Sequence, residues 1–164
     1  MDNIILIGMP GAGKSTVGVL LAKTLGYAFL DTDLVIQQRE GALLQPLVDS
    51  LGVEAFLDVE ADAICSVECR GTVIAPGGSA VCRERAMSHL RALGRIVYLH
   101  LPLEELERRL SNISTRGIAM APGETLADLF ARRAPLYRNY VDLTVDVGRQ
   151  SLEETVALVL RALR

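Results

Sequence analysis

The sequence predicts an α/β protein with three layers, in which helices cover both faces of a five-stranded parallel sheet. Short runs of branched apolar residues alternate along the chain with longer segments of helical periodicity. Parallel neighbours need long crossover connections, and helices supply these on both faces of such a sheet. A glycine-rich turn follows the first apolar run and leads directly into a helical segment. We therefore expect a single domain over residues 1–164.

Five segments have the composition of short buried strands, and Ile4-Ile5-Leu6-Ile7 is the clearest of them. The predicted strands are residues 4–7, 27–30, 72–75, 95–101 and 142–147. Ligands of parallel sheets bind at the carboxyl ends of the strands. Polar or glycine-rich segments follow three of these strands, at residues 8–16, 31–33 and 76–79. The sequence therefore predicts a site where these three segments meet.

The remaining segments carry the spacing of helices. In residues 14–25, Val17, Leu21 and Leu25 fall on one face, and Gly26 follows as a stop signal. The predicted helices are residues 14–25, 34–38, 43–51, 53–69, 83–93, 103–110, 126–140 and 152–163.

The segment 111–124 lacks a helical stripe. It has mixed polarity and contains Gly117, Pro122 and Gly123. Glycines at such positions can absorb the backbone change of a closing loop. We therefore expect residues 111–124 to form a mobile lid.

Composition and charge exclude several classes of protein. Half of the residues are apolar, which supports a folded interior. The formal net charge of −3 gives no reason to expect a surface for nucleic acid or a membrane. The N-terminus does not resemble a signal peptide, and no apolar run approaches the about 20 residues of a membrane span. We expect a cytoplasmic monomer without nucleic-acid or membrane partners.

The three cysteines are Cys65, Cys69 and Cys82. Cys65 and Cys69 lie four residues apart on a predicted helix, so a metal-binding pair is one interpretation. His89 and His100 are the histidines that would complete such a site, and neither has the spacing of a zinc finger. We expect buried or idle thiols, because a free cysteine behaves as a small hydrophobic residue.

The turn after the first strand matches a phosphate-binding motif. Residues 8–15 fit the pattern G-x-x-x-x-G-K-[ST]. The glycines let successive backbone N–H groups point inward as an anion-binding nest, and the following helix directs its N-terminus at the same phosphates. In such loops Lys14 reaches the β- and γ-phosphates, and the Ser15 hydroxyl is a Mg²⁺ ligand. The sequence therefore predicts a P-loop that binds ATP and Mg²⁺.

Two carboxylates, Asp31 and Asp33, follow the second predicted strand. The chain has no N-K-x-D tetrapeptide of a GTPase, and residues 72–75 and 95–101 do not end in the acid of a motor or transporter ATPase. Residues i and i+2 of extended chain point the same way. One carboxylate can then hold Mg²⁺ through water while the other orients an acceptor hydroxyl and takes its proton. A solvated helix N-cap is the alternative interpretation.

These motifs together resemble the shikimate kinase family among the nucleoside-monophosphate-kinase-like P-loop proteins. The resemblance covers nearly the whole chain. It rests on residues 8–16, Asp31-Thr32-Asp33, Gly77-Gly78, Arg116 and Arg133-Ala134-Pro135-Leu136-Tyr137. The last segment is the most distinctive, because R-x-P-L-Y recurs in that family where an arginine holds the carboxylate of the acceptor.

On the ATP side, the resemblance implies that one continuous segment surrounds the phosphates. Its residues are Gly11, Ala12, Gly13, Lys14, Ser15 and Thr16. Ser15 would ligate Mg²⁺ with Asp31 near the metal, and Arg109 would lie against the adenine. Arg116 would swing in on the lid to stabilise the transferring phosphoryl group.

On the acceptor side, the resemblance implies that Asp33 binds the acceptor hydroxyls and serves as the base. Gly78, together with Gly77, would present backbone N–H groups, and Arg133 would hold the carboxylate. The implied catalytic residues are Lys14, Asp33 and Arg116. The implied reaction is that of the shikimate pathway of aromatic amino acid biosynthesis: the γ-phosphoryl group of ATP passes to a hydroxyl of shikimate, giving shikimate 3-phosphate and ADP.

The chain departs from the family pattern at two places. The pattern F-R-x-x-E has Leu57 at its arginine, which removes a second clamp on the carboxylate, and Ser79 stands where a third glycine is usual. A charge-assisted hydrogen bond contributes about 1.5–3 kcal/mol, so its loss weakens acceptor binding roughly ten- to a hundredfold. Asp58 places a carboxylate near the gap. The candidate substitutes for the arginine are Arg39, Arg83 and Arg85.

Two other functions stay open at this point. One is a related kinase whose acceptor lacks a carboxylate or carries an amine, which Leu57 and Asp58 suggest. The other is a nucleotide-binding regulator with a decayed catalytic site, against which the intact pair Asp31 and Asp33 argues. A coupled ATP-consumption assay with a panel of acceptors separates all three.

Overall fold

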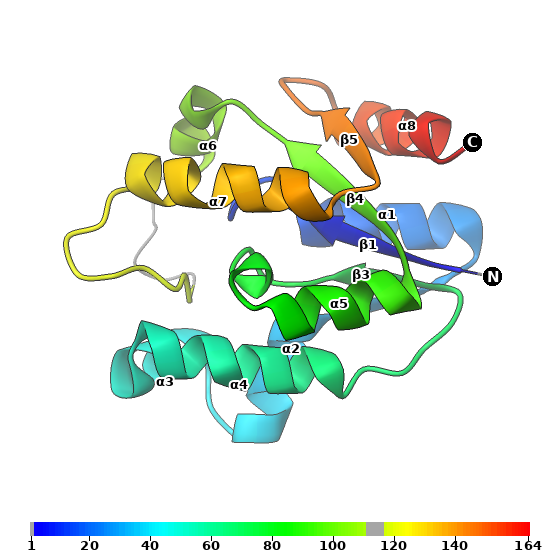
Figure 1. The fold of residues 1–164 in the computed structure, drawn as a ribbon. Helices are drawn as coiled ribbons and strands as arrows, with labels where there is room; N and C mark the ends of the chain where they lie inside the picture. The colour runs from blue at the N-terminus through cyan, green and yellow to red at the C-terminus, as the bar shows by residue number, and fades with distance from the viewer. Residues whose placement is uncertain (1, 111–116) are drawn as a thin grey trace.

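The computed structural model describes residues 2–110 and 117–164, and its centre is a parallel sheet of five strands (Figure 1). The strands lie in the order β2-β3-β1-β4-β5. Their bounds are β1 Asn3–Ile7, β2 Ala28–Asp31, β3 Thr72–Ala75, β4 Gly94–His100 and β5 Leu143–Asp146. All four neighbouring pairs are parallel. The predicted fold class is therefore confirmed.

The helices follow the predicted order. They are α1 Lys14–Leu25, α2 Thr32–Glu40, α3 Leu44–Leu51, α4 Val53–Cys65, α5 Glu84–Leu93, α6 Leu103–Arg109, α7 Leu126–Tyr140 and α8 Leu152–Leu163, with a short 3₁₀ helix at Ala80–Cys82. No helix in the described part of the chain combines the length and the apolar composition that a membrane span needs.

The prediction for α4 was wrong at its end. The helix stops at Cys65, where Ser66 caps it with backbone N–H bonds and a side-chain bond to the Ala63 carbonyl, and not at Cys69. Cys69 thus lies in the connection to β3, so the two thiols do not share a helix face. The cysteines are free thiols, and no group of three His, Cys, Asp or Glu side chains in the described ranges could hold a metal ion.

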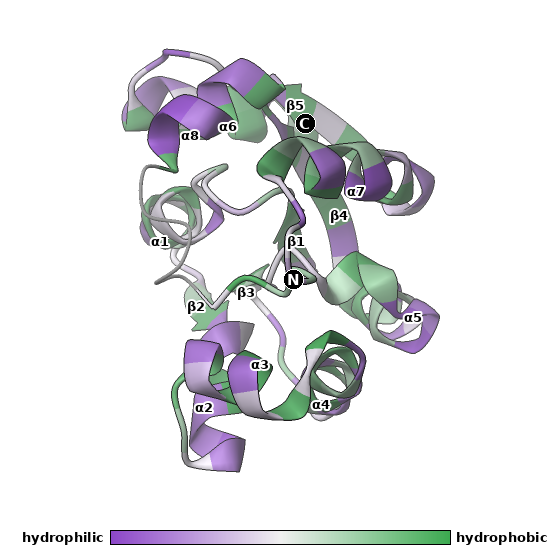
Figure 2. Ribbon diagram, turned by 90° about the vertical axis from the view of Figure 1, so that its left-hand side faces the viewer, coloured by the Kyte–Doolittle hydropathy of each residue, from purple (hydrophilic) through white to green (hydrophobic). Residues whose placement is uncertain are grey.

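Helices cover both faces of the sheet. Figure 2 shows α1 and α8 on one side of the strands and α5 and α7 on the other, while α2, α3 and α4 form a separate group beside the β2 end. The central strand β1 is buried along its whole length, which explains its purely apolar character from Ile4 to Ile7.

The protein has two hydrophobic cores. The main core lies between the sheet and its covering helices. The second core consists of Ile36, Leu44, Leu47, Val48, Phe56, Leu57, Ala63 and Ala119. Each fully buried aliphatic side chain stabilises the fold by about 1.5–3 kcal/mol. The second core therefore holds α2, α3 and α4 together, while Ala61 and Ile64 of α4 also join the main core.

Candidate active site

A cavity of about 400 Å³ opens where the carboxyl ends of β1, β2 and β3 meet. The predicted residues that line it are Gly11, Gly13, Lys14, Ser15, Thr16, Asp31, Asp33, Gly77, Gly78, Arg109 and Arg133. Ala12 does not line it: its side chain is buried, and its N–H closes the turn by donating to the Met9 carbonyl. Arg116 lies outside the described residues.

The P-loop presents unpaired donors to this cavity. Gly13 is the N-cap of α1 with a φ of +90°, a left-handed conformation that a residue with a side chain rarely adopts. Since no side chain within residues 2–110 and 117–164 caps the helix, its first N–H groups are available for an anion. Lys14 Nζ donates to the carbonyls of Gly8 and Met9 at 2.7 and 2.9 Å. Burial lowers the pKa of Lys14 to about 8. An anionic ligand would favour the protonated, positively charged form of this side chain.

Ser15 and Asp31 meet at one corner of the cavity. The Ser15 hydroxyl donates to Asp31 Oδ2 at 2.9 Å. Hydroxyl and carboxylate oxygens are the ligands that Mg²⁺ prefers, usually completed by water and substrate phosphates. The chemistry of the pair therefore fits a Mg²⁺ ion beside the P-loop, which Ser15 and Asp31 would hold.

The carboxylate pair does not have the backbone geometry that the sequence suggested. Asp31 is the N-cap of α2, and its Oδ1 accepts from the Asp33 N–H at 2.9 Å. Asp33 thus lies in the first turn of a helix and not on extended chain. The N-cap interpretation is correct for Asp31, yet both side chains still line the cavity because the helix begins at its edge.

Asp33 has the electrostatics of a base. Burial, together with the neighbouring Asp31 charge and against the opposing effect of Lys14, raises its pKa to about 6. A carboxylate with a pKa near the working pH accepts a proton more effectively than an exposed one. Asp33 is therefore the cavity's best candidate for taking the proton of an acceptor hydroxyl.

Gly77 is required by a close approach. A Cβ there would lie 2.6 Å from Glu60 Oε2 and 3.1 Å from Asp33 Oδ1, so the two carboxyl groups converge over this glycine. Glu60 is 2% exposed and accepts from the Ser79 hydroxyl at 2.6 Å. Burial raises its pKa to about 7, and the bond from Ser79 opposes that shift.

Arg133 lines the cavity from α7. It is 1% exposed and donates from Nη2 to the Ala119 carbonyl at 3.1 Å. Its Nε has no hydrogen-bond partner within the described part of the chain. An unpaired buried donor is costly, so the described chain does not fully satisfy this guanidinium, and its position in the cavity lining suits an anionic group.

The R-x-P-L-Y segment also positions the acceptor loop. Tyr137 is fully buried in α7, and its hydroxyl donates to the Gly78 carbonyl at 2.6 Å. A Cβ on Gly78 would lie 3.1 Å from Arg133 Nη1, so a residue with a side chain would require the guanidinium to shift. Arg133 and Tyr137 thus act on the same loop from one turn of the helix.

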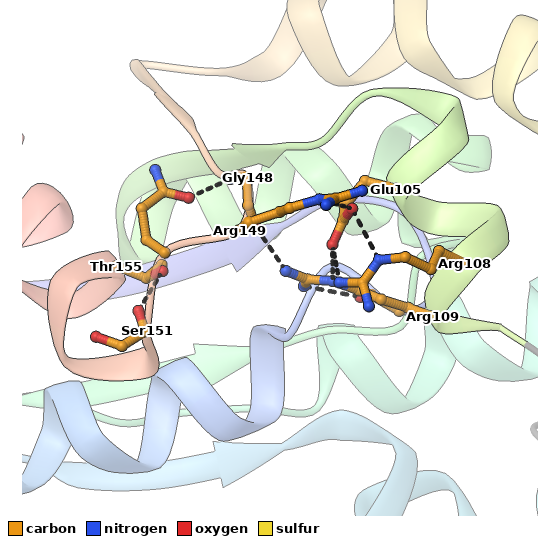
Figure 3. Close-up of polar contacts among 9 residues, drawn as sticks. Glu105, Arg108, Arg109, Gly148, Arg149, Ser151 and Thr155 are labelled. Carbon is orange, nitrogen blue, oxygen red and sulfur yellow. Dashed lines mark hydrogen bonds and ion pairs between the residues drawn. The ribbon is translucent and has the colours of Figure 1, made fainter.

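Arg109 lies on the P-loop side. It donates to the Gly11 carbonyl at 3.4 Å and to the Gly148 carbonyl at 2.9 Å, and it pairs with Glu105 (Figure 3). It therefore connects α6 with the P-loop and with the turn after β5. The role of Arg109 against the adenine stays a prediction.

Leu57 does not line the cavity. It is 5% exposed and belongs to the second hydrophobic core. Asp58, next to it, points outward: its side chain is 60% exposed and pairs with Arg83 at 2.8 Å. The expectation that Asp58 adds a carboxylate to the acceptor pocket was wrong, because adjacent helical residues face different directions.

The candidate substitutes for the missing arginine were wrong as well. Arg83 is engaged with Glu54 and Asp58, and Arg85 pairs with Asp62, all on the outer side of α4. Arg39 is exposed in the last turn of α2. None of the three lines the cavity. Among the described residues, the basic side chains of the cavity are those of Lys14, Arg109 and Arg133.

Sequence reasoning assigned no role to several cavity residues. They are Pro10, Phe56, Glu60, Ser79, Ile118 and Ala119. Glu60 closes the F-x-x-x-E remnant of the family pattern, and this was the one available signal. Its contact with Ser79 spans 19 positions of the chain and could not be inferred from spacing.

The fold and the site define a P-loop phosphotransferase, a kinase for a small acceptor. The shikimate kinase family model matches residues 10–164. The chain is 41% identical over 169 residues to a shikimate kinase of Pseudomonas aeruginosa, covering all of this chain and 97% of the relative. A shikimate kinase of Pseudomonas paraeruginosa is 42% identical over 168 residues, with the same coverage. The chain belongs to the shikimate kinase family.

Solved structures agree with this assignment. A shikimate kinase from Acinetobacter baumannii in complex with shikimate superposes with a TM-score of 0.89 at 30% identity, over 99% of this chain and 93% of the other. A shikimate kinase from Aquifex aeolicus superposes with a TM-score of 0.76 at 28% identity, over 98% and 95%. The similarity therefore includes the α2–α4 group as well as the sheet.

Proposed function

We propose that the enzyme transfers the γ-phosphoryl group of ATP to a hydroxyl of shikimate, giving shikimate 3-phosphate and ADP. One observation carries the proposal: the P-loop donors and the carboxylate of Asp33 face one cavity with a buried, incompletely paired Arg133. The P-loop donors and Asp33 are the groups that phosphoryl transfer needs, and Arg133 suits an anionic acceptor. Family membership supports the same substrate.

In the proposed mechanism the residues divide by the charge that each one faces. The P-loop N–H groups and Lys14 hold the phosphates and neutralise the charge that grows on their oxygens during transfer. Ser15 and Asp31 would hold Mg²⁺, which would supply positive charge against the phosphates. Asp33 takes the proton of the attacking hydroxyl. We also propose that Arg116, on the lid segment 111–124, stabilises the transferring group.

On the acceptor side, Arg133 binds the carboxylate, while Gly77 and Gly78 offer backbone N–H groups. Glu60 adds a second carboxyl next to Asp33 and suits the hydroxyls of a polyhydroxy acceptor. Since position 57 is apolar and buried, Arg133 alone among the described basic residues of this wall grips the anion.

The test is a coupled ATP-consumption assay with shikimate, a decarboxylated analogue and other polyhydroxy acids. Efficient turnover of shikimate with discrimination against the analogue is expected. Absence of shikimate turnover by folded, nucleotide-binding protein would exclude the proposal. The alternative is a kinase for an acceptor without a carboxylate, and it is favoured by the apolar Leu57; preferential use of the analogue would support it. ATP binding without turnover of any acceptor would indicate a regulator.

We further propose a cytoplasmic monomer. The support for the cytoplasm is that the three cysteines are free thiols, as a reducing compartment keeps them. Light scattering behind a size-exclusion column gives the oligomeric state, and a dimer at assay concentration would exclude the monomer.

A further inference from the structure

One buried carboxylate beside the P-loop faces three arginines. Glu105 lies on α6, and its side chain is only 9% exposed. It accepts from Arg108 Nε at 3.1 Å and also from Arg108 Nη2, and it accepts from Arg109 Nε at 3.2 Å. Arg149 Nε lies 3.7 Å from its second oxygen. Figure 3 shows these side chains converging on Glu105 from α6 and from the turn after β5.

The three arginines differ in what else they contact. Arg108 and Arg149 have side chains that are 57% and 83% exposed, and neither lines the cavity. Arg109 is 27% exposed and does line it. Glu105 itself does not reach the cavity. Its connection to the site therefore runs through the guanidinium of Arg109.

Arg109 is held on three sides. Its Nε bonds to Glu105, its Nη1 to the Gly11 carbonyl and its Nη2 to the Gly148 carbonyl. Two of these partners are backbone atoms in loops, and the third is a charged side chain on a helix. An arginine side chain has many rotamers, and a planar guanidinium fixed by a carboxylate loses less freedom when a ligand binds.

The charge of Glu105 is available over the whole physiological range. The hydrogen bonds from Arg108 and Arg109 lower its pKa to about 2, with Arg108 contributing most. Arg108 thus donates to the carboxylate from the exposed side, and Arg109 donates to it from the side of the cavity.

We propose that Glu105 is a positioning residue for the nucleotide: it holds the Arg109 guanidinium between the P-loop and the turn at Gly148, in the place where it contacts bound ATP or ADP. The inference rests on the proposed function, because it requires that Arg109 contacts the nucleotide. It goes beyond that function by assigning a role to a residue that touches neither substrate.

A double-mutant cycle on nucleotide affinity tests the proposal. The dissociation constants of ADP and of a nonhydrolysable ATP analogue are measured by calorimetry for wild type, Glu105→Gln, Arg109→Ala and the double variant. Glu105→Gln keeps the size of the side chain but removes its charge, and we expect about three- to tenfold weaker binding. The double variant should bind like Arg109→Ala alone, because Glu105 acts through Arg109.

The matched control is Glu107→Gln, the same chemical change at an exposed position of α6. It should leave nucleotide affinity unaltered. Steady-state kinetics of Glu105→Gln should show a raised KM for ATP with kcat and the KM for shikimate near wild type. Glu105→Asp, which retains the charge on a shorter side chain, should restore part of the affinity, and this variant serves if Glu105→Gln does not fold.

Three results would overturn the proposal: normal nucleotide affinity of folded Glu105→Gln, an additive loss in the double variant, or normal affinity of Arg109→Ala. An additive loss would indicate that Glu105 acts on the fold of α6 and not on Arg109. Calorimetry needs no acceptor. A protein that binds nucleotide as expected but leaves shikimate untouched would therefore contradict the proposed function and not the role of Glu105.

Discussion

Replacement of Arg133 by alanine should separate acceptor binding from ATP binding. The side chain is 1% exposed and lines the cavity, and its buried Nε has no partner in the described chain. Arg133 reaches the cavity from α7, whereas the phosphate-binding groups belong to the loop between β1 and α1. The variant should therefore raise the KM for shikimate and leave the KM for ATP near wild type.

The magnitude follows from the bonds that are lost. A hydrogen bond to a charged group contributes about 1.5–3 kcal/mol, and about 1.4 kcal/mol corresponds to a tenfold change. One lost bond predicts about a ten- to hundredfold loss in kcat/KM for shikimate, and a bidentate pair predicts more. Arg133→Lys keeps the charge without the planar fork and should fall between wild type and Arg133→Ala.

The assay compares shikimate with its decarboxylated analogue. Arg133→Ala should reduce turnover of shikimate strongly and that of the analogue little, since the analogue has no carboxylate to lose. Arg138→Ala is the matched control, because Arg138 lies on the same helix α7 and is exposed. Arg138→Ala should behave as wild type.

Equal losses on shikimate and the analogue would refute the reasoning, because they would place Arg133 in the fold and not on the carboxylate. The loss of its bond to the Ala119 carbonyl also removes structural support, so thermal unfolding of each variant is recorded beside the kinetics. A variant that is folded and still binds shikimate normally would equally exclude the clamp.

Three further predictions follow from the same cavity. Lys14→Ala should stay folded by circular dichroism and lose several orders of magnitude in turnover, since Lys14 neutralises the transferred charge; near-normal turnover would show that this loop is not catalytic. Asp33 must be ionised to act as base, so kcat/KM should fall about tenfold per pH unit below its pKa of about 6. The Glu60→Gln variant should show the same fall of kcat/KM at low pH. If the fall disappeared in this variant, the titrating group would be Glu60 and not Asp33. Ser79→Ala should lower the free energy of unfolding by about 1–3 kcal/mol, because buried Glu60 loses its hydrogen bond. Since a carboxyl with a raised pKa destabilises the fold once ionised, that loss should grow as the pH rises through about 7, and a pH-independent loss would contradict it.

The P-loop and its surroundings were predictable from sequence because their interactions are local. The strand at Ile4–Ile7, the turn and the helix from Lys14 are consecutive, and the glycine pattern determines the backbone that presents the donors. Lys14 bonds to carbonyls only five and six positions away. Hydrophobic periodicity likewise predicts the sheet and its covering helices, since it records which face of each element is buried.

The acceptor wall depended on packing between distant segments, which spacing does not encode. Whether Leu57 lines the cavity or a core is decided by how α4 packs on α2 and α3, and a rotation of one residue along the helix exchanges the two outcomes. The pairing of Glu60 with Ser79 and the bond from Arg109 to Gly148 join elements that only the folded sheet brings together. The sequence by itself determined that a phosphate-binding motif follows the first strand. The tertiary structure decided which charged groups complete the site, because desolvation and hydrogen bonding act through space and not along the chain.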